Sequence, residues 1–460
     1  MSRTVLAIDI GSTKICAVIA EIKNGDDISI IGAGTTKAQG LKRGSIVNIE
    51  LAAKSIKAAL DDARRISGST INRAIISISG AYAKGINSDG IVNIQSKEIT
   101  YAEIERVMQT ASYNANIPHE FEVLHVLPYN FKIDDQDSNI EDPLGMDASR
   151  LKAEVHIITT QKSFLNNLRK TVKTAGLEIE GVVLSSYASL IATINDDEKE
   201  LGAVVIDMGG NSCNLAIHSG NSIRYNEFLG VGSHHVTTDL SMALHTPIEE
   251  ADRVKLQYGS LQSTSSDLIE VPTIGVENDR QEVSLEVVRN VVYARVDETL
   301  KLLAHFVENS GLSENIGAGI ILTGGFSKMD GIRELAVAIF GSLPVRLARP
   351  KELNGHFDTL RGPEYASVIG LILYAAKPYT LYEIDINKQI RRNETLASEP
   401  QKTLEDLKEP IIPQPSTASK QKPKEASGMV MLGDKKKKSA KDSTEPGSIR
   451  KFWNWMTQLF

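Results

Sequence analysis

The sequence predicts an α/β protein with two similar domains, because two distant stretches repeat one pattern. In residues 5–14 and again in residues 203–212, a run of apolar residues ends in an aspartate that is followed by a polar turn containing glycine. Helical periodicity over residues 50–67 and alternation over residues 71–79 then give the helix-to-strand order of an α/β sheet. With 460 residues, the chain is long enough for two or three domains.

The composition of the chain excludes several classes of protein. Hydrophobic residues make up 41% of the chain, which is ordinary for a globular protein, and the net charge of −7 argues against a general nucleic-acid binder. The two cysteines, Cys16 and Cys213, lack the spacing of metal ligands and are interpreted as small core residues in a reducing compartment. The first residues do not resemble a signal peptide and no apolar run reaches transmembrane length, so we expect the protein to stay inside the cell.

Each aspartate of the repeated pattern precedes a turn that suits an anion. The turn after Asp9 contains Gly11, Ser12, Thr13 and Lys14. The turn after Asp207 contains Gly209, Gly210, Asn211 and Ser212. Free backbone amides in such turns form a concavity for a phosphate, and a carboxylate beside it can hold a hydrated cation. Either turn alone could be a plain surface hairpin, but the pair predicts two hairpins that face each other across one phosphate.

A small α/β module is predicted inside the first domain. Strands are expected over residues 90–94, 122–128 and 152–159, and they surround a helix that begins with a capping box at Thr100 and Glu103. The module is therefore placed at residues 84–161.

The remaining elements alternate between helix and strand. Helices are expected over residues 162–175, 185–194, 247–258, 283–310 and 364–376, with another from Met329, and strands over residues 179–184 and 316–323. The strand over residues 316–323 ends at Gly324 and Gly325, a third glycine turn that suits the approach of a nucleotide.

The end of the chain has a different composition. Residues 384–447 are rich in Lys, Glu, Pro and Ser and are predicted to be a disordered linker. Residues 448–460 are predicted to form an amphipathic helix that lies in a membrane interface. Its membrane-contacting residues are expected to be Ile449, Phe452, Trp453, Trp455, Met456, Leu459 and Phe460. The alternative is a tail that folds back onto the core or docks in a partner's groove.

These motifs resemble those of the actin/Hsp70/sugar-kinase superfamily and, within it, the FtsA family of bacterial cell-division proteins. The resemblance covers most of residues 1–383 and rests on residues 9–14, 124–129, 142–146, 207–214 and 321–325. It implies an actin-like two-domain fold with an FtsA-type insert. The implied subdomains are 1A (residues 1–83 and 162–195), an SHS2-like 1C (84–161), 2A (196–230 and 301–383) and 2B (231–300).

The resemblance also implies ATP and Mg²⁺ in the cleft between the domains. Both hairpin turns would bind phosphate, and Asp9 and Asp207 would hold Mg²⁺ through its waters. Gly324 and Gly325 would lie near the adenosine, with Asp252 and Lys255 near the ribose. The second turn departs from the usual Gly-Thr ending, since Asn211 and Ser212 stand there. Binding should survive this change, whereas no residue is a clear candidate for positioning an attacking water, so we expect at most weak ATPase activity.

The partners implied by the resemblance are those of the division ring. The chain would bind the C-terminal peptide of the tubulin-like protein FtsZ, with Arg295 as a candidate contact, although an ion pair between Arg295 and Glu298 or Asp297 is an equal alternative. It would also form actin-like filaments, whose many terminal helices bind anionic lipids by avidity. Further division proteins would dock on it at the cytoplasmic face of the membrane, where it tethers FtsZ and helps to assemble the septal ring. The alternatives are a small-molecule kinase or chaperone of the same fold, and an actin-like filament protein of cell shape or pilus assembly.

Overall fold

The computed structural model describes residues 2–23, 27–134, 139–262, 265–275, 279–355 and 358–398. All of them belong to one compact unit, which contains the two domains and the insert. The predicted linker beyond residue 398 and the predicted helix over residues 448–460 lie outside the described residues.

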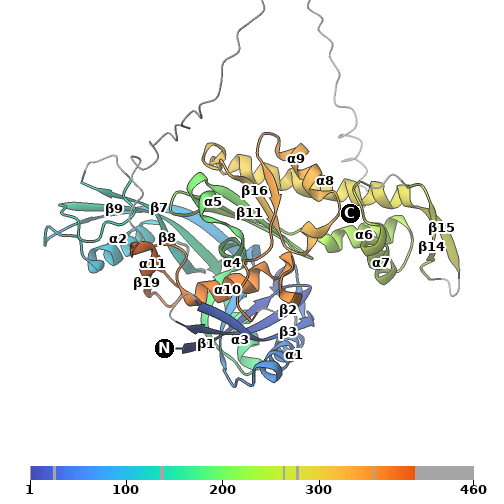
Figure 1. The fold of residues 1–460 in the computed structure, drawn as a ribbon, viewed down its shortest axis with the longest axis horizontal. Helices are drawn as coiled ribbons and strands as arrows, with labels where there is room; N and C mark the ends of the chain where they lie inside the picture. The colour runs from blue at the N-terminus through green and yellow to red at the C-terminus, as the bar shows by residue number, and fades with distance from the viewer. Residues whose placement is uncertain are drawn as a thin grey trace, which may run out of the picture. The chain divides into compact units, whose positions relative to one another are not determined.

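Two five-stranded sheets with matching topology form the two halves of this unit (Figure 1). The first has the order β10 (Glu178–Leu184), β6 (Arg73–Ile78), β1 (Ser2–Ile10), β2 (Lys14–Lys23) and β3 (Asp27–Lys37). The second has the order β17 (Val345–Leu347), β16 (Gly319–Thr323), β11 (Ala203–Met208), β12 (Cys213–Ser219) and β13 (Ser222–Leu229). In each sheet, the central strand pairs antiparallel with the strand that follows it and parallel with a later strand. The predicted two-domain α/β fold is confirmed.

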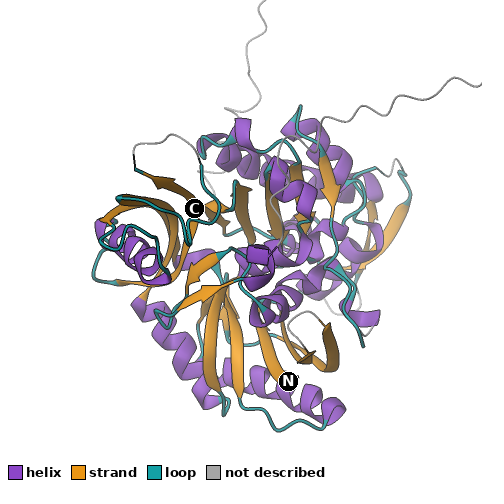
Figure 2. Cartoon of the chain, turned by 60° about the vertical axis from the view of Figure 1, so that its left-hand side comes forward, coloured by secondary structure: helices purple, strands orange, loops and turns teal. Residues whose placement is uncertain are grey.

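Helices pack against these sheets because they present one apolar face (Figure 2). Helix α1 (Ile49–Ser67) covers β2 and β3, begins at Asn48, whose side chain accepts a hydrogen bond from the Leu51 amide, and ends at Gly68 with φ of 68°. The other helices outside the insert are α3 (Lys162–Thr174), α4 (Ser185–Thr193), α5 (Asp196–Leu201), α6 (Ser233–Ala243), α7 (Ile248–Tyr258), α8 (Leu285–Asn309), α9 (Ile332–Phe340), α10 (Ala366–Ala376) and α11 (Glu394–Ser398). Within the described ranges, no helix is both long and apolar enough to cross a membrane.

A third five-stranded sheet combines three strands of the insert, which lies between β6 and α3, with two strands that follow α10. Its strands follow the order β19 (Ile390–Arg392), β18 (Tyr382–Ile384), β8 (Phe121–Ile133), β9 (Arg150–Gln161) and β7 (Ala83–Asn93). Helix α2 (Tyr101–Asn114) packs on it, and the capping box at Thr100 and Glu103 is present as predicted. Two short ribbons, β4–β5 (Leu41–Lys42 and Ser45–Ile46) and β14–β15 (Leu268–Pro272 and Arg280–Ser284), complete the strands.

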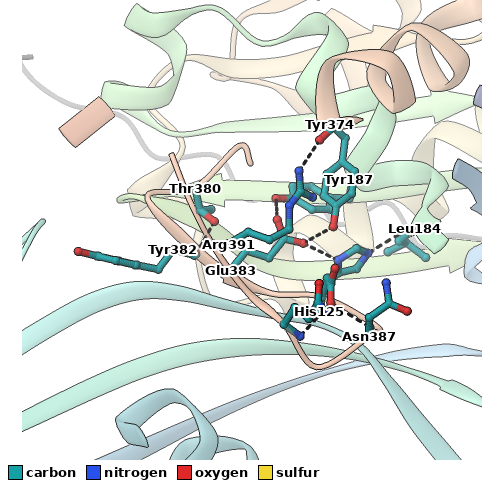
Figure 3. A network of polar contacts seen from close by, with 11 residues as sticks. His125, Leu184, Tyr187, Tyr374, Thr380, Tyr382, Glu383, Asn387 and Arg391 are labelled. Atoms are coloured by element: carbon teal, nitrogen blue, oxygen red, sulfur yellow. Dashed lines mark hydrogen bonds and ion pairs between the residues drawn. The ribbon is translucent and has the colours of Figure 1, made fainter. Parts of the chain in front are cut away.

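The start of the predicted linker at residue 384 is wrong. Residues 384–398 belong to the fold, because β18 and β19 extend the insert's sheet and α11 follows them. A buried polar network explains why a segment with little apolar character is held there (Figure 3). Glu383 accepts hydrogen bonds from Tyr374 (2.9 Å) and Tyr187 (3.3 Å), and it contacts Nδ1 of His125 at 2.7 Å. Composition signals apolar burial, so it does not detect a segment fixed mainly by buried hydrogen bonds.

The two halves meet at helices α4 and α10, which lie unusually close together. A Cβ atom added to Gly370 would stand 1.8 Å from the carbonyl oxygen of Ala188. Glycine at this position therefore allows direct contact between the two helix backbones, and both helices are almost wholly buried.

We predict that Gly370→Ala lowers the free energy of unfolding by about 1–3 kcal/mol or more, because the added methyl group must separate the two helices. Chemical denaturation followed by circular dichroism would measure the change. Gly181→Ala is the matched control, since its nearest neighbour would be an Ile75 side-chain atom at 3.8 Å. Equal stability of both variants would contradict this account of the helix contact.

Candidate nucleotide site

A cavity of about 390 Å³ lies between the two sheets and is lined by both predicted turns. A volume of this size is within the range of small-molecule sites. The predicted residues that line it are Asp9, Gly11, Ser12, Thr13, Lys14, Asp207, Gly209, Gly210, Asn211, Ser212, Gly324 and Gly325. Segments far apart in the sequence are therefore brought to one site, as the repeated pattern indicates.

The first turn is held in shape by backbone and side-chain hydrogen bonds. The Gly11 amide donates to the Lys14 carbonyl at 3.1 Å, and the Ser12 hydroxyl accepts from the Gly44 amide at 2.6 Å. The Lys14 ammonium donates to the Glu364 carbonyl at 2.7 Å and lies 3.5 Å from the centre of the Tyr365 ring. A cation is therefore fixed at the wall of the cavity, where burial lowers its pKa.

The second turn lies directly against the first. A Cβ atom on Gly210 would stand 1.9 Å from the Thr13 hydroxyl oxygen, so the two turns are in contact across the cavity. The start of α6 supports this turn from behind, since the amides of Ser233 and His234 donate to the carbonyls of Gly209 (3.2 Å) and Gly210 (2.7 Å). Hydrogen bonds within the protein thus hold both turns in position.

The two aspartates are half-buried, and serine hydroxyls support each of them. Ser77 donates to Asp9 at 2.8 Å. Ser189 of α4 and Ser367 of α10 both approach Asp207, at 2.6 and 3.0 Å. Because α4 and α10 form the contact between the two halves, the position of the Asp207 carboxylate depends on that contact.

The electrostatics of the aspartates favour a bound cation. Burial raises the pKa of Asp9 to about 6; hydrogen bonding from Ser77 and the charge of Lys14 oppose the rise, and the charge of Asp207 adds to it. Burial likewise raises the pKa of Asp207. A divalent cation would stabilise both ionised carboxylates, and carboxylate oxygens are the ligands that Mg²⁺ prefers. The turn amides, hydroxyls and Lys14 suit phosphate oxygens, so the residues present fit Mg²⁺ with a nucleoside phosphate.

Gly324 allows the backbone to lie close to the Asp207 carboxylate. Its φ of 84° is a conformation that side chains disfavour, and a Cβ atom there would stand 2.3 Å from Asp207 Oδ1. The glycine pair therefore lets β16 close onto the end of β11, at the wall of the cavity.

The structure places Asp252 and Lys255 outside the lining of the cavity. On α7, Lys255 donates to Asp252 at 2.6 Å and to Thr237 of α6 at 2.8 Å. Thr237 is one helical turn from the lining residue Ser233, so the pair lies beside the cavity and is already satisfied internally.

Sequence reasoning missed the residues that support the site from other elements. These are Ser77, Ser189, Glu364, Tyr365 and Ser367. The sequence signal for Ser77, Ser189 and Ser367 was a serine within an otherwise apolar segment. Local periodicity cannot assign such a serine to a site.

The structure gives Arg295 acidic partners within the chain. Its guanidinium contacts both carboxylate oxygens of Asp239 on α6, at 2.5 and 3.1 Å, and Glu298 at 2.5 Å. The predicted alternative of an ion pair with Glu298 is confirmed, while Asp297 pairs with Lys301 instead.

Comparisons with known proteins agree with this architecture. Residues 204–370 match the family model for cell division protein FtsA, and residues 80–159 match that for the SHS2 domain inserted in FtsA. The chain is 40% identical to cell division protein FtsA of Helicobacter pylori over 423 residues, with 85% of each chain covered. It is 36% identical to FtsA of Pseudomonas aeruginosa over 375 residues, with 81% of this chain and 89% of that protein covered.

A solved PilM–PilN type IV pilus biogenesis complex shares the fold. The TM-score is 0.59 at 17% identity, with 81% of this chain and 99% of the solved chain covered. The predicted actin-like fold with an FtsA-type insert is confirmed. The relatives are similar over most of their own length as well as most of this chain, so the chain belongs to the FtsA family of cell division proteins.

Proposed function

We propose that this chain is an ATP-binding switch that tethers FtsZ filaments to the cytoplasmic membrane during division. The proposal that the chain binds a nucleotide rests on the cavity in which two equivalent turns, one lysine and two half-buried aspartates converge. The turn amides and Lys14 would hold the phosphates. Asp9 and Asp207 would hold Mg²⁺, which would neutralise phosphate charge and draw the two halves together.

ATP hydrolysis in this site would depend on an acidic residue that is not already engaged. The acidic residues in the lining are Asp9, Asp207 and Glu364. Both aspartates are engaged by serine hydroxyls, and the Glu364 carbonyl holds Lys14. Phosphoryl transfer to water depends on a residue that orients the nucleophile. The remaining acidic group is the Glu364 carboxylate, whose Oε1 contacts Lys328 at 3.3 Å and whose Oε2 has no hydrogen-bond partner among the described residues, so hydrolysis in this site would depend on that carboxylate.

The contacts with the membrane and with FtsZ are proposed from the sequence and the family. The terminal stripe from Ile449 to Phe460 would bind lipid, and the preceding lysines would face anionic headgroups. An acidic FtsZ peptide would reach Arg295 by exchanging its carboxylates for those of Asp239 or Glu298. Filament formation would multiply the weak binding of a single terminal helix.

We predict that Asp207→Ala weakens Mg²⁺-dependent ATP binding by at least about tenfold, which corresponds to about 1.4 kcal/mol. The reason is that the substitution removes one of two carboxylates positioned for the cation. Isothermal titration calorimetry would measure the affinity. Removing Mg²⁺ with EDTA should weaken ATP binding far more in the unmodified chain than in Asp207→Ala.

Asp297→Ala is the matched control for this experiment, because it removes a carboxylate that pairs with Lys301 on α8, away from the cavity. Its ATP affinity should not change. If Asp207→Ala binds ATP as tightly as the unmodified chain, the cavity is not the nucleotide site. Asp252→Ala tests the proposed ribose contact separately, and a loss of affinity there would support it.

We predict that the full chain co-sediments with vesicles containing anionic lipid and that a chain ending at Thr444 does not. Within the full chain, Trp453→Glu should abolish sedimentation, since it places a charge on the apolar stripe. Asn454→Glu adds the same charge to the polar face and is the matched control. Equal sedimentation of the truncated chain would refute the terminal anchor.

A further inference from the structure

The inserted subdomain contacts the second half of the molecule through a partly buried set of polar residues. Asn226 lies on β13, the edge strand of the second sheet, and its carboxamide oxygen is 2.9 Å from Nε2 of His156 on β9. The Nδ1 atom of His156 is 2.7 Å from the carboxamide oxygen of Asn87 on β7. Asn87 in turn donates to the Arg224 carbonyl of β13 at 3.2 Å. These four residues form a closed ring that begins and ends on β13.

The protonation state of His156 determines which groups of this ring donate hydrogen bonds and which accept them. Burial lowers the pKa of His156 to about 4, so the imidazole is neutral at physiological pH and carries one ring proton. The bond from Asn87 to Arg224 fixes the Asn87 oxygen toward Nδ1, so Nδ1 carries the proton. Nε2 is then an acceptor, so the oxygen and nitrogen of the Asn226 carboxamide are assigned here in the exchanged orientation, with the NH₂ group in the position 2.9 Å from Nε2. His156 and Asn226 are the buried members of the ring, so loss of either one leaves the other with an unsatisfied buried polar group.

The same part of the second sheet carries one turn of the cavity. β13 pairs with β12 along its length, and β12 starts directly after the turn that contains Gly209 and Asn211. Asn214 of β12 lines the cavity and accepts a hydrogen bond from the amide of Gly80, at the start of the insert, at 3.3 Å. A single hairpin therefore contacts both the nucleotide cavity and the insert.

The insert is held separately to the first half. It is connected there by the chain at both ends, through β6 and α3. The network of Figure 3 adds a second attachment, in which the Leu184 amide at the end of β10 donates to Nε2 of His125 at 3.3 Å. A rotation that separates the two halves must therefore break the contacts between the insert and β13 or displace the insert.

We propose that the ring formed by Asn87, His156, Arg224 and Asn226 is a latch, by which the inserted subdomain holds the nucleotide cavity closed. The latch is formed in the arrangement in which the two turns touch at Thr13 and Gly210. A ligand that binds both turns stabilises the same arrangement, so the latch and the nucleotide strengthen each other. By the same linkage, a protein that pulls the insert away from β13 lowers nucleotide affinity. This inference rests on the proposed nucleotide binding and names how it is regulated.

The test is the affinity of the full chain for Mg²⁺ with the β,γ-imido analogue of ATP. Asn226→Ala should weaken binding by about fivefold or more, the range typical of coupling between sites. Asn87→Ala changes an exposed residue of the same ring, so it should fold normally and weaken binding in the same direction. Asn114→Ala is the matched control: Asn114 also lies on the insert and donates to the Asp89 carbonyl, away from β13. Its affinity should equal that of the unmodified chain.

Hydrogen exchange provides a second measurement of the latch. The analogue should slow amide exchange in residues 83–93 of the unmodified chain and leave it unchanged in Asn226→Ala, while the cavity turns are protected in both. Wild-type affinity in both ring variants, with normal protection of residues 83–93, overturns the latch alone. Absence of binding and of cavity protection in the unmodified chain overturns the proposed nucleotide function and the latch with it.

Discussion

Two half-buried aspartates are the constraint on which this molecule depends. Asp9 and Asp207 lie on the central strands of their sheets, and the structure brings both carboxylates to one cavity. Burial of an ionised carboxylate is costly unless hydrogen bonds or a cation compensate. Serine hydroxyls provide part of that compensation, and the raised pKa values show that part of the cost remains. A bound divalent cation would therefore lower the free-energy cost of ionising the two carboxylates.

The connections between the parts of the molecule are of two physical kinds. Helices α4 and α10 meet through small residues, so their contact is a close approach of backbones. The insert is attached through buried polar groups: His125 and Glu383 toward the first half, and His156 and Asn226 toward the second. Apolar contacts tolerate small slips, whereas hydrogen-bonded contacts are satisfied or broken. Hydrogen-bonded contacts therefore define the position of the insert more strictly than apolar contacts would.

The insert also depends on chain far from itself. Its sheet is completed by β18 and β19, which follow α10 near the end of the described chain. The described chain therefore ends one short helix after the insert's sheet.

The sequence alone determined the parts that local pattern encodes. Apolar runs ending in Asp9 and Asp207, followed by glycine turns, predicted both strands and the cavity they line. Helix α1 and the capping box at Thr100 also follow from local periodicity and side-chain chemistry. Only the tertiary structure decided which serines support the aspartates, where β18 and β19 pair, and that His156 joins the insert to β13. Those contacts join residues far apart in the chain through single hydrogen bonds, and a hydrogen bond between distant residues leaves no period in the sequence.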